Sequence, residues 1–232
     1  MILYDLAGGD DRLRFSPYCW RVRLALAHKG LPFETRPWRL TDQQAIAFSG
    51  QGLVPVLVDG EHCVHDSWQI ACHLEDSYPQ RPSLFGGAAG RALTRFIDRW
   101  YEQAIRPVLP RMVLLAAYAA VHQRDRAHFR ATREARFGNR PLEEVAYGAE
   151  QGRALLEQAL APVRDVLTRA PFVGGQDMSY ADYIVFSGFQ QARVLGVSLL
   201  SDLDPMRAWL DRMLDAHDGC ARQAWVIPAQ PG

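Results

Sequence analysis

The sequence predicts an α/β unit with the element order strand, helix, strand, then strand, strand, helix, followed by an all-helical region. Short apolar segments alternate with a helical repeat as far as Tyr78. The dipeptide Asp59-Gly60 separates two strand-like segments and is typical of a tight hairpin. Every long segment after Gly90 has the periodicity of a helix.

The first half contains four expected strands and two expected helices. The strands are short and rich in strand-forming residues: Ile2–Leu6, Phe33–Pro37, Val54–Val58 and Glu61–His65. The helices are Pro17–Lys29, with Gly30 after it, and Trp68–Tyr78. A helix that joins two strands gives a parallel βαβ unit, whereas Asp59-Gly60, expected to form a type I′ turn, gives an antiparallel pair.

Residues 79–90 have the proline and glycine density of a linker, and the domain boundary is expected there. The helices expected beyond it are Ala92–Ile105, Arg111–Gln123, Arg124–Arg136, Leu142–Thr168, Ala181–Leu195 and Pro205–His217. Pro107 and Pro110 are expected to break the first pair, because proline removes a backbone donor. The arginine-rich stretch 124–136 is interpreted as a solvated helix face, not as a nucleic-acid patch.

The box Ser179 to Asp182 has the spacing of a capping box and precedes an apolar run. This pattern predicts a firmly nucleated helix start. We interpret its role as structural.

Composition narrows the classes of function. The 232 residues include 26 acidic and 26 basic side chains, a balance that favours a small-molecule partner over nucleic acid or a membrane surface. Without a signal-peptide pattern or an 18-residue apolar run, a cytoplasmic protein is expected. The four cysteines have no zinc-like spacing, so we expect neither a metal nor a structural disulfide.

The most informative segment begins at Ser16, where a strand and loop lead into a helix. Ser16 followed by Pro17 has the pattern of a helix N-cap and first helical residue. The free N–H groups and positive dipole end of that helix would favour an anion, such as a thiolate, beside the Ser16 hydroxyl. The alternative is that Ser16 only caps the helix.

Taken together, these segments resemble a cytosolic glutathione transferase over essentially the whole chain. The motifs that carry the resemblance are Ser16-Pro17-Tyr18-Cys19-Trp20-Arg21, Leu53-Val54-Pro55-Val56-Leu57, Asp66-Ser67 and the box Ser179 to Asp182. The resemblance implies a thioredoxin-like glutathione-binding domain over residues 1–79, a linker over 80–90, and an all-α domain over 91–232 that contributes the electrophile pocket. A homodimer is also expected by resemblance.

The resemblance assigns glutathione-binding roles to several of these residues. The bond before Pro55 is expected to be cis, and the backbone of Val54 would pair with the cysteinyl part of glutathione as an added strand does. Asp66 and Ser67 would hold the γ-glutamyl end, the alternative being ordinary helix capping. The glycine end is assigned to the loop residues Gln51, Trp38 and Arg39, with Arg39 meeting its carboxylate.

The resemblance also implies that Ser16 is the catalytic residue and donates a hydrogen bond to the glutathione sulfur. Lowering a thiol pKa from about 8.5 by two units requires about 2.7 kcal/mol, which one hydroxyl and a helix N-terminus can supply. The thiolate would then attack a small hydrophobic electrophile in a pocket near Tyr18 and Tyr101. Glutathione acts as co-substrate, and this mechanism needs no metal.

The sequence resembles more than one class of glutathione transferase. The tract Trp20 to Leu26 resembles the zeta class, but Pro17 and Tyr18 replace that class's Ser and Cys. Ser16-Pro17-Tyr18 and Ala27-His28-Lys29-Gly30 resemble instead the bacterial beta-etherases, which cleave aryl ethers by glutathione attack, and related fungal enzymes. A detoxifying transferase, with an aryl ether as one candidate substrate, is therefore expected.

Two alternatives stay open. The segment Ser16-Pro17-Tyr18-Cys19 also resembles a glutaredoxin motif whose first cysteine is replaced, so a glutathione-dependent thiol transferase or reductase could use Cys19. A non-catalytic binding protein on the same fold is the other alternative. Glutathione affinity separates the non-catalytic binding protein from the two enzyme hypotheses, because both enzymes must bind glutathione and a regulator need not.

Overall fold

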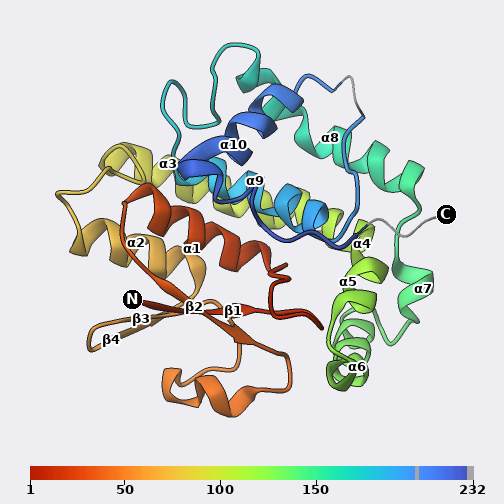
Figure 1. The fold of residues 1–232 in the computed structure, drawn as a ribbon. Coiled ribbons are helices and arrows are strands. Elements are labelled where there is room, and N and C mark those ends of the chain that lie inside the picture. The colour runs from red at the N-terminus through yellow and green to blue at the C-terminus, as the bar shows by residue number, and fades with distance from the viewer. Residues whose placement is uncertain (202–203, 229–232) are drawn as a thin grey trace.

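The computed structural model describes residues 1–201 and 204–228 (Figure 1). Its sheet has the strand order β2-β1-β3-β4. The strands are β1 (Ile2–Leu6), β2 (Glu34–Trp38), β3 (Val56–Asp59) and β4 (His62–His65). β1 runs parallel to β2 and antiparallel to β3, which pairs in turn with β4. The mixed sheet and its element order confirm the thioredoxin-like prediction for this half.

Two helices cover the face of this sheet that is turned toward the rest of the chain (Figure 1). They are α1 (Pro17–His28) and α2 (Ser67–Ser77). Gly30, just beyond α1, has φ of +60°, as expected of a glycine that ends a helix. Trp20, Leu24 and Leu26 of α1 are fully buried, so this helix forms the centre of the packing.

The hairpin turn differs from its expected form. Because Asp59 pairs with His62, the two turn residues are Gly60 and Glu61, and of these only Gly60 has positive φ. A type I′ turn requires positive φ at both positions, whereas glycine at the first alone is typical of type II′. β3 also starts at Val56, two residues later than expected.

The helical half begins at Ala88, inside the proline- and glycine-rich segment 79–90 and four residues before the expected helix start at Ala92. Its α-helices are α3 (Ala88–Trp100), α4 (Leu109–Met112), α5 (Leu114–Ala120), α6 (Arg126–Arg136), α7 (Leu142–Val145), α8 (Ala149–Leu167), α9 (Tyr180–Val194) and α10 (Arg207–Gly219). A π-helical turn, Tyr101–Ile105, continues α3. The all-helical prediction is confirmed.

Two of the expected long helices are broken. The segment 111–123 divides at Val113, whose dihedral angles (φ −100°, ψ 4°) leave the helical region. The segment 142–168 divides at Ala146 and Gly148, which are both extended. In α10 the dihedral angles depart from helical values at Ala216, one residue before the expected end.

Helix α9 connects the two halves through its packing against α1. Its N-terminus is the expected capping box: Ser179 and Asp182 exchange the two reciprocal hydrogen bonds. Asp182 also accepts from the Trp209 indole at 3.0 Å, which ties α10 to α9. The structural role predicted for this box is therefore confirmed.

Among the described residues, no helix is both long enough and apolar enough to span a membrane. In the same part of the chain, no cluster of three or more His, Cys, Asp or Glu side chains is arranged to hold a metal ion.

Candidate active site

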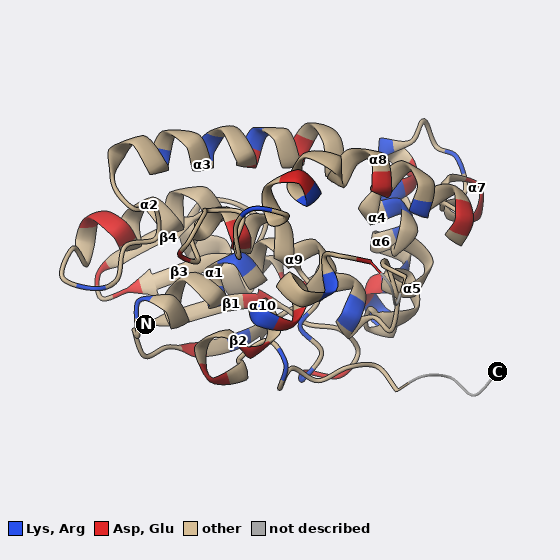
Figure 2. Cartoon of the chain, turned by 90° about the horizontal axis from the view of Figure 1, so that it is seen from above, with Lys and Arg blue, Asp and Glu red and all other residues tan. Residues whose placement is uncertain are grey.

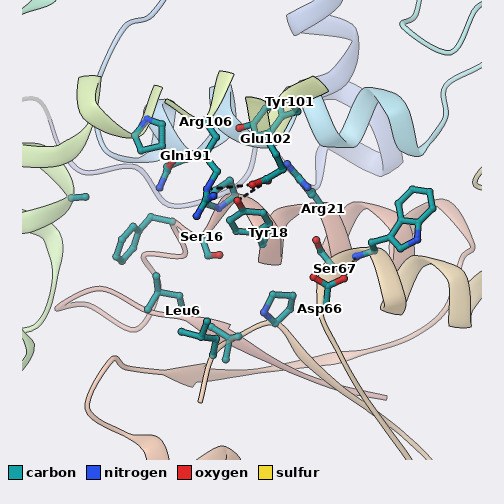
Figure 3. A pocket seen from close by; sticks show the side chains of 18 of the residues that line it. Leu6, Ser16, Tyr18, Arg21, Asp66, Ser67, Tyr101, Glu102, Arg106 and Gln191 are labelled. Atoms are coloured by element: carbon teal, nitrogen blue, oxygen red, sulfur yellow. Dashed lines mark hydrogen bonds and ion pairs between the residues drawn. The ribbon is translucent and has the colours of Figure 1, made fainter. Parts of the chain in front are cut away.

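A cavity of about 630 Å³ lies between the sheet-bearing half and the helices (Figure 3). This volume lies in the range of ordinary small-molecule sites. The cavity brings together nine of the ten residues predicted from the sequence: Ser16, Tyr18, Trp38, Gln51, Val54, Pro55, Asp66, Ser67 and Tyr101. Arg39 does not line it.

Ser16 lies at the N-terminus of α1 and faces the cavity (Figure 3). Its Oγ accepts the backbone N–H of Cys19 at 3.3 Å, so it is a true N-cap. Pro17 follows as the first helical residue, as the sequence predicts. A hydroxyl can accept and donate at once, so capping leaves the Ser16 O–H able to donate to a ligand.

The loop before β3 forms another wall. The Val54-Pro55 peptide bond is cis, as predicted. The side-chain Oε1 of Gln51 accepts from the Leu53 N–H at 2.7 Å, which holds the backbone that leads into Val54. Gln51 therefore braces this loop as well as lining the cavity.

Arg39 is directed elsewhere. Its guanidinium forms an ion pair with Asp11, and its Nε is buried without a hydrogen-bond partner. The indole of Trp38 donates to the carbonyl of Asp42 at 2.8 Å. Sequence spacing places Arg39 next to the cavity-lining Trp38 but does not reveal this pairing.

Asp66 and Ser67 meet at the start of α2 (Figure 3). Asp66 has φ of +69°, and its Oδ1 accepts from the N–H groups of Trp68 and Gln69 at 3.0 and 3.1 Å. Tyr180 on α9 donates to the Ser67 carbonyl at 2.7 Å. The helical half thus fixes the position of this pair.

Tyr18 contacts Glu102, a residue of the π-helical turn that the sequence did not reveal. The Tyr18 hydroxyl donates to Glu102 Oε1 at 2.8 Å, and Arg106 Nε lies 3.3 Å from the other carboxylate oxygen (Figure 3). Burial, together with the Glu102 carboxylate, raises the pKa of Tyr18 well above its ordinary value. Tyr18 is therefore a neutral hydroxyl and not a base.

A buried arginine connects the site to the helical half. Arg21 is 1% exposed, and its guanidinium contacts Asp98 at 3.0 Å and Ser187 at 3.3 Å. It lies between the rings of Tyr18 and Tyr101, 4.7 Å from each centroid. Its Nη2 is buried without a hydrogen-bond partner.

Tyr101 is 3% exposed, and so forms more of the core than of the open cavity. A side chain at position 188 would strike its hydroxyl, because a Cβ on Gly188 would lie 2.6 Å away. Gly188 on α9 thus makes room for Tyr101.

Two further arginines on α6, Arg133 and Arg136, also line the cavity. Arg136 is exposed, as the interpretation of residues 124–136 as a solvated helix face predicts, whereas Arg133 is only partly exposed and departs from that interpretation. Helical periodicity alone could not place them, because their position depends on how α6 packs against the other half.

Cys19 is fully buried in α1. Burial, with the neighbouring Asp5, raises the pKa of its thiol well above the ordinary value. Because the thiolate is the reactive form of cysteine, this environment is unfavourable for nucleophilic chemistry.

Comparison with known families agrees with this fold. Residues 12–82 match the glutathione S-transferase N-terminal domain, and residues 92–212 match the glutathione S-transferase C-terminal domain. The protein belongs to the glutathione S-transferase family.

Relatives are similar over parts of the chain. Glutathione S-transferase Z1 of Arabidopsis thaliana is 37% identical over 87 residues, covering 33% of this chain and 39% of the relative. The aligned segment thus spans about two fifths of that relative's length. A probable glutathione S-transferase of rice (Oryza sativa subsp. japonica) is 28% identical over 177 residues, covering 75% of this chain and 67% of the relative.

Solved structures share the fold more completely. A glutathione transferase of Phanerochaete chrysosporium superposes with a TM-score of 0.77 at 26% identity, covering 94% of this chain and 91% of its own. A glutathione S-transferase of Ceriporiopsis subvermispora, solved in complex with glutathione, gives a TM-score of 0.81 at 21% identity over 99% of both chains.

Proposed function

We propose that this protein is a glutathione transferase in which Ser16 activates the thiol of glutathione for attack on a hydrophobic electrophile. The observation that carries the proposal is the position of Ser16, a cavity-lining hydroxyl at the N-terminus of α1. Its O–H donates to the sulfur, and the positive end of the helix favours the thiolate over the thiol.

The rest of the cavity is suited to the remainder of glutathione. The backbone at Val54 offers an edge to the cysteinyl unit, in the manner of an added strand. Asp66 uses one carboxylate oxygen to cap α2, which leaves the other for the ammonium of the γ-glutamyl end. The carboxylate of the γ-glutamyl unit would bind to Ser67 and to the N-terminus of α2.

In the proposed reaction the sulfur forms a bond to an electrophilic carbon, and the leaving group departs with the bonding electron pair. The electrophile packs against apolar residues that line the same cavity as Tyr18. These residues are Pro110, Val113, Leu114, Ala117 and Phe129. Aryl ethers belong among the electrophiles to be screened, with chlorodinitrobenzene as the general probe.

The burial of Cys19 supports Ser16 as the active group over a thiol transferase mechanism through Cys19. Such a mechanism requires a thiolate that can reach a disulfide. Replacement of Cys19 by Ala is expected to leave conjugation unchanged.

We also propose that the protein forms a homodimer through α3. Leu93 and Phe96 lie three residues apart on this helix and are each 68% exposed. Side chains at this spacing share one face of a helix. Two large apolar side chains exposed together are typical of a surface covered by a partner.

The test is the kcat/KM for glutathione conjugation in Ser16→Ala, Ser16→Thr and Ser179→Ala. Loss of the hydroxyl's share of the thiolate stabilisation, about 1.4 kcal/mol, lowers the rate about tenfold or more in Ser16→Ala, whereas Ser16→Thr keeps a hydroxyl and most of the rate. Ser179→Ala removes an N-cap outside the cavity and controls for the loss of a cap alone. Equal activity in Ser16→Ala and wild type would contradict the proposal.

A further inference from the structure

The cavity has more positive than negative charge on its walls. Six arginines line it, against three carboxylates. Four of these arginines contact a carboxylate: Arg21, Arg95 and Arg99 surround Asp98, and Arg106 faces Glu102. Arg133 and Arg136 differ, because neither forms an ion pair with any residue in the described part of the chain.

Arg133 and Arg136 are three residues apart on α6 and therefore lie on the same helix face. They are close enough that Arg136 contributes to the lowered pKa of Arg133. Two like charges held together on a cavity wall repel each other unless an anion lies between them or beside them.

The acidic side chains nearest in sequence are already engaged. Glu134 accepts from Arg130 at 2.8 Å and from the backbone of Leu142 at 3.1 Å. Glu143 accepts from both terminal nitrogens of Arg130, at 3.1 and 2.6 Å. These carboxylates therefore neutralise Arg130, which does not line the cavity, and leave Arg133 without a counter-charge.

Arg133 is also partly withdrawn from water. Its guanidinium lies 4.4 Å from the ring centre of the buried Phe129 and donates to Thr132 Oγ1 at 2.9 Å. Burial, with Arg136 second, lowers the pKa of Arg133 to about 10. A cation in such surroundings gains more from an incoming anion than one that is fully hydrated.

The arrangement of the fold places these arginines away from the residues assigned to the γ-glutamyl end. Figures 1 and 2 both show α6 at the opposite end of the molecule from α2 and β4. α6 instead adjoins α5, and its Phe129 belongs to the apolar wall. Arg133 and Arg136 thus extend the part of the cavity that is left for the electrophile.

We propose that Arg133 and Arg136 bind an anionic group, such as a carboxylate, on the electrophile. The preferred substrates would then be apolar electrophiles with an acidic substituent, the apolar part resting on Phe129. This inference rests on the proposed function, since it names the substrate class of the same site. A guanidinium pair binds a carboxylate through charge-assisted hydrogen bonds.

Two conjugates that differ by one carboxylate group test the inference: S-benzylglutathione and S-(carboxybenzyl)glutathione. Calorimetry would compare their Kd values for wild type, Arg133→Gln, Arg136→Gln and the double variant. Arg126→Gln is the matched control, because Arg126 is an exposed arginine of the same helix that does not line the cavity. Glutamine has nearly the helix propensity of arginine, so α6 is retained.

The wild type is expected to bind the carboxylated conjugate about tenfold more tightly than the plain one, a difference of about 1.4 kcal/mol. The double variant loses this preference, and binding of S-benzylglutathione stays within about twofold, because charge-assisted bonds are lost only for the acid. Arg126→Gln keeps the preference. Added salt weakens the preference in wild type, as expected for a partly exposed charge pair.

Three outcomes would overturn the inference. Equal affinity for the two conjugates in wild type means that the arginines do not recognise the added charge. Equal weakening of both conjugates in the double variant means that the arginines hold glutathione itself. Failure of wild type to bind either conjugate rejects the proposed function and the inference with it, a result distinct from the other two.

Discussion

The Oγ of Ser16 accepts a hydrogen bond from the backbone N–H of Cys19 at 3.3 Å, and this bond fixes the hydroxyl at the N-terminus of α1. The same residue therefore starts the helix and lines the cavity. The structural and catalytic interpretations of Ser16 are compatible, because an N-cap uses a lone pair of the oxygen and leaves the proton.

Tyr18→Phe is expected to alter electrophile binding but not thiol activation. The mutation removes the hydroxyl that donates to Glu102, while Arg106 remains as a partner of that carboxylate. Without this hydrogen bond the Tyr18 ring and the Glu102 carboxylate are held less firmly in the cavity wall, and the KM for the electrophile is expected to rise, by up to about tenfold. Steady-state kinetics at fixed glutathione measures it; an unchanged KM with a strongly reduced thiolate population would assign activation to Tyr18 instead.

Asp98→Asn is expected to destabilise the protein strongly. The Arg21–Asp98 ion pair is buried, with side-chain exposures of 1% and 6%, and it joins α1 to α3. Breaking one partner of a buried pair costs about 3–5 kcal/mol. Urea unfolding measures the loss, and Asp76→Asn is the control, because its pair with Arg91 is largely exposed and contributes under about 1 kcal/mol. Similar losses in both variants would contradict this role.

Stability is expected to fall as the solution is acidified, through His28 and His217. Tyr183 lies between them, 2.6 Å from His28 Nδ1 and 2.7 Å from His217 Nε2. Burial, then His217 and Lys29, lowers the pKa of His28 from 6.5 to about 4. Between these values the unfolded chain binds more protons, so stability is full above about pH 6.5 and declines toward pH 4.

Unfolding midpoints in urea at several pH values within that window measure this effect. His28→Asn is expected to show a shallower decline than wild type, because the titrating group is gone. His128→Asn, a change at an exposed histidine on α6, keeps the wild-type slope. An unaltered slope in His28→Asn would show that other groups are responsible.

Phe96→Glu is expected to convert a dimer into monomers. The substitution places a charge on the exposed face of α3, where an apolar partner surface would leave it desolvated. Sedimentation velocity gives the mass. Val166→Glu, at an exposed apolar position on α8, is the control and stays dimeric. A monomeric wild type at micromolar concentration would refute the dimer.

The parts of the fold that the sequence predicts correctly are those set by local chemistry. Ser16-Pro17, Gly30 and the box Ser179 to Asp182 each satisfy free backbone groups or allow a special dihedral angle. Val113 interrupts a helix although it is neither glycine nor proline, so no local signal marks this break.

The residues of the candidate site also fall into a group that the sequence predicts and a group that it does not. Ser16, Val54 and Asp66 lie at element ends, and their positions follow from the topology. Glu102 and Arg133 enter the cavity through the packing of the π-helical turn after α3 and of α6 against distant segments, which no local pattern encodes. For the same reason, the pairing of Arg39 with Asp11 could not be foreseen.

The most direct test of the central proposal is the ultraviolet absorbance of bound glutathione thiolate as a function of pH in wild type and Ser16→Ala. For wild type, the thiol pKa is expected about two units below the usual value of about 8.5. In Ser16→Ala it rises by one unit or more, on the order of 1.4 kcal/mol. Identical titration curves for the two proteins would contradict the role of Ser16.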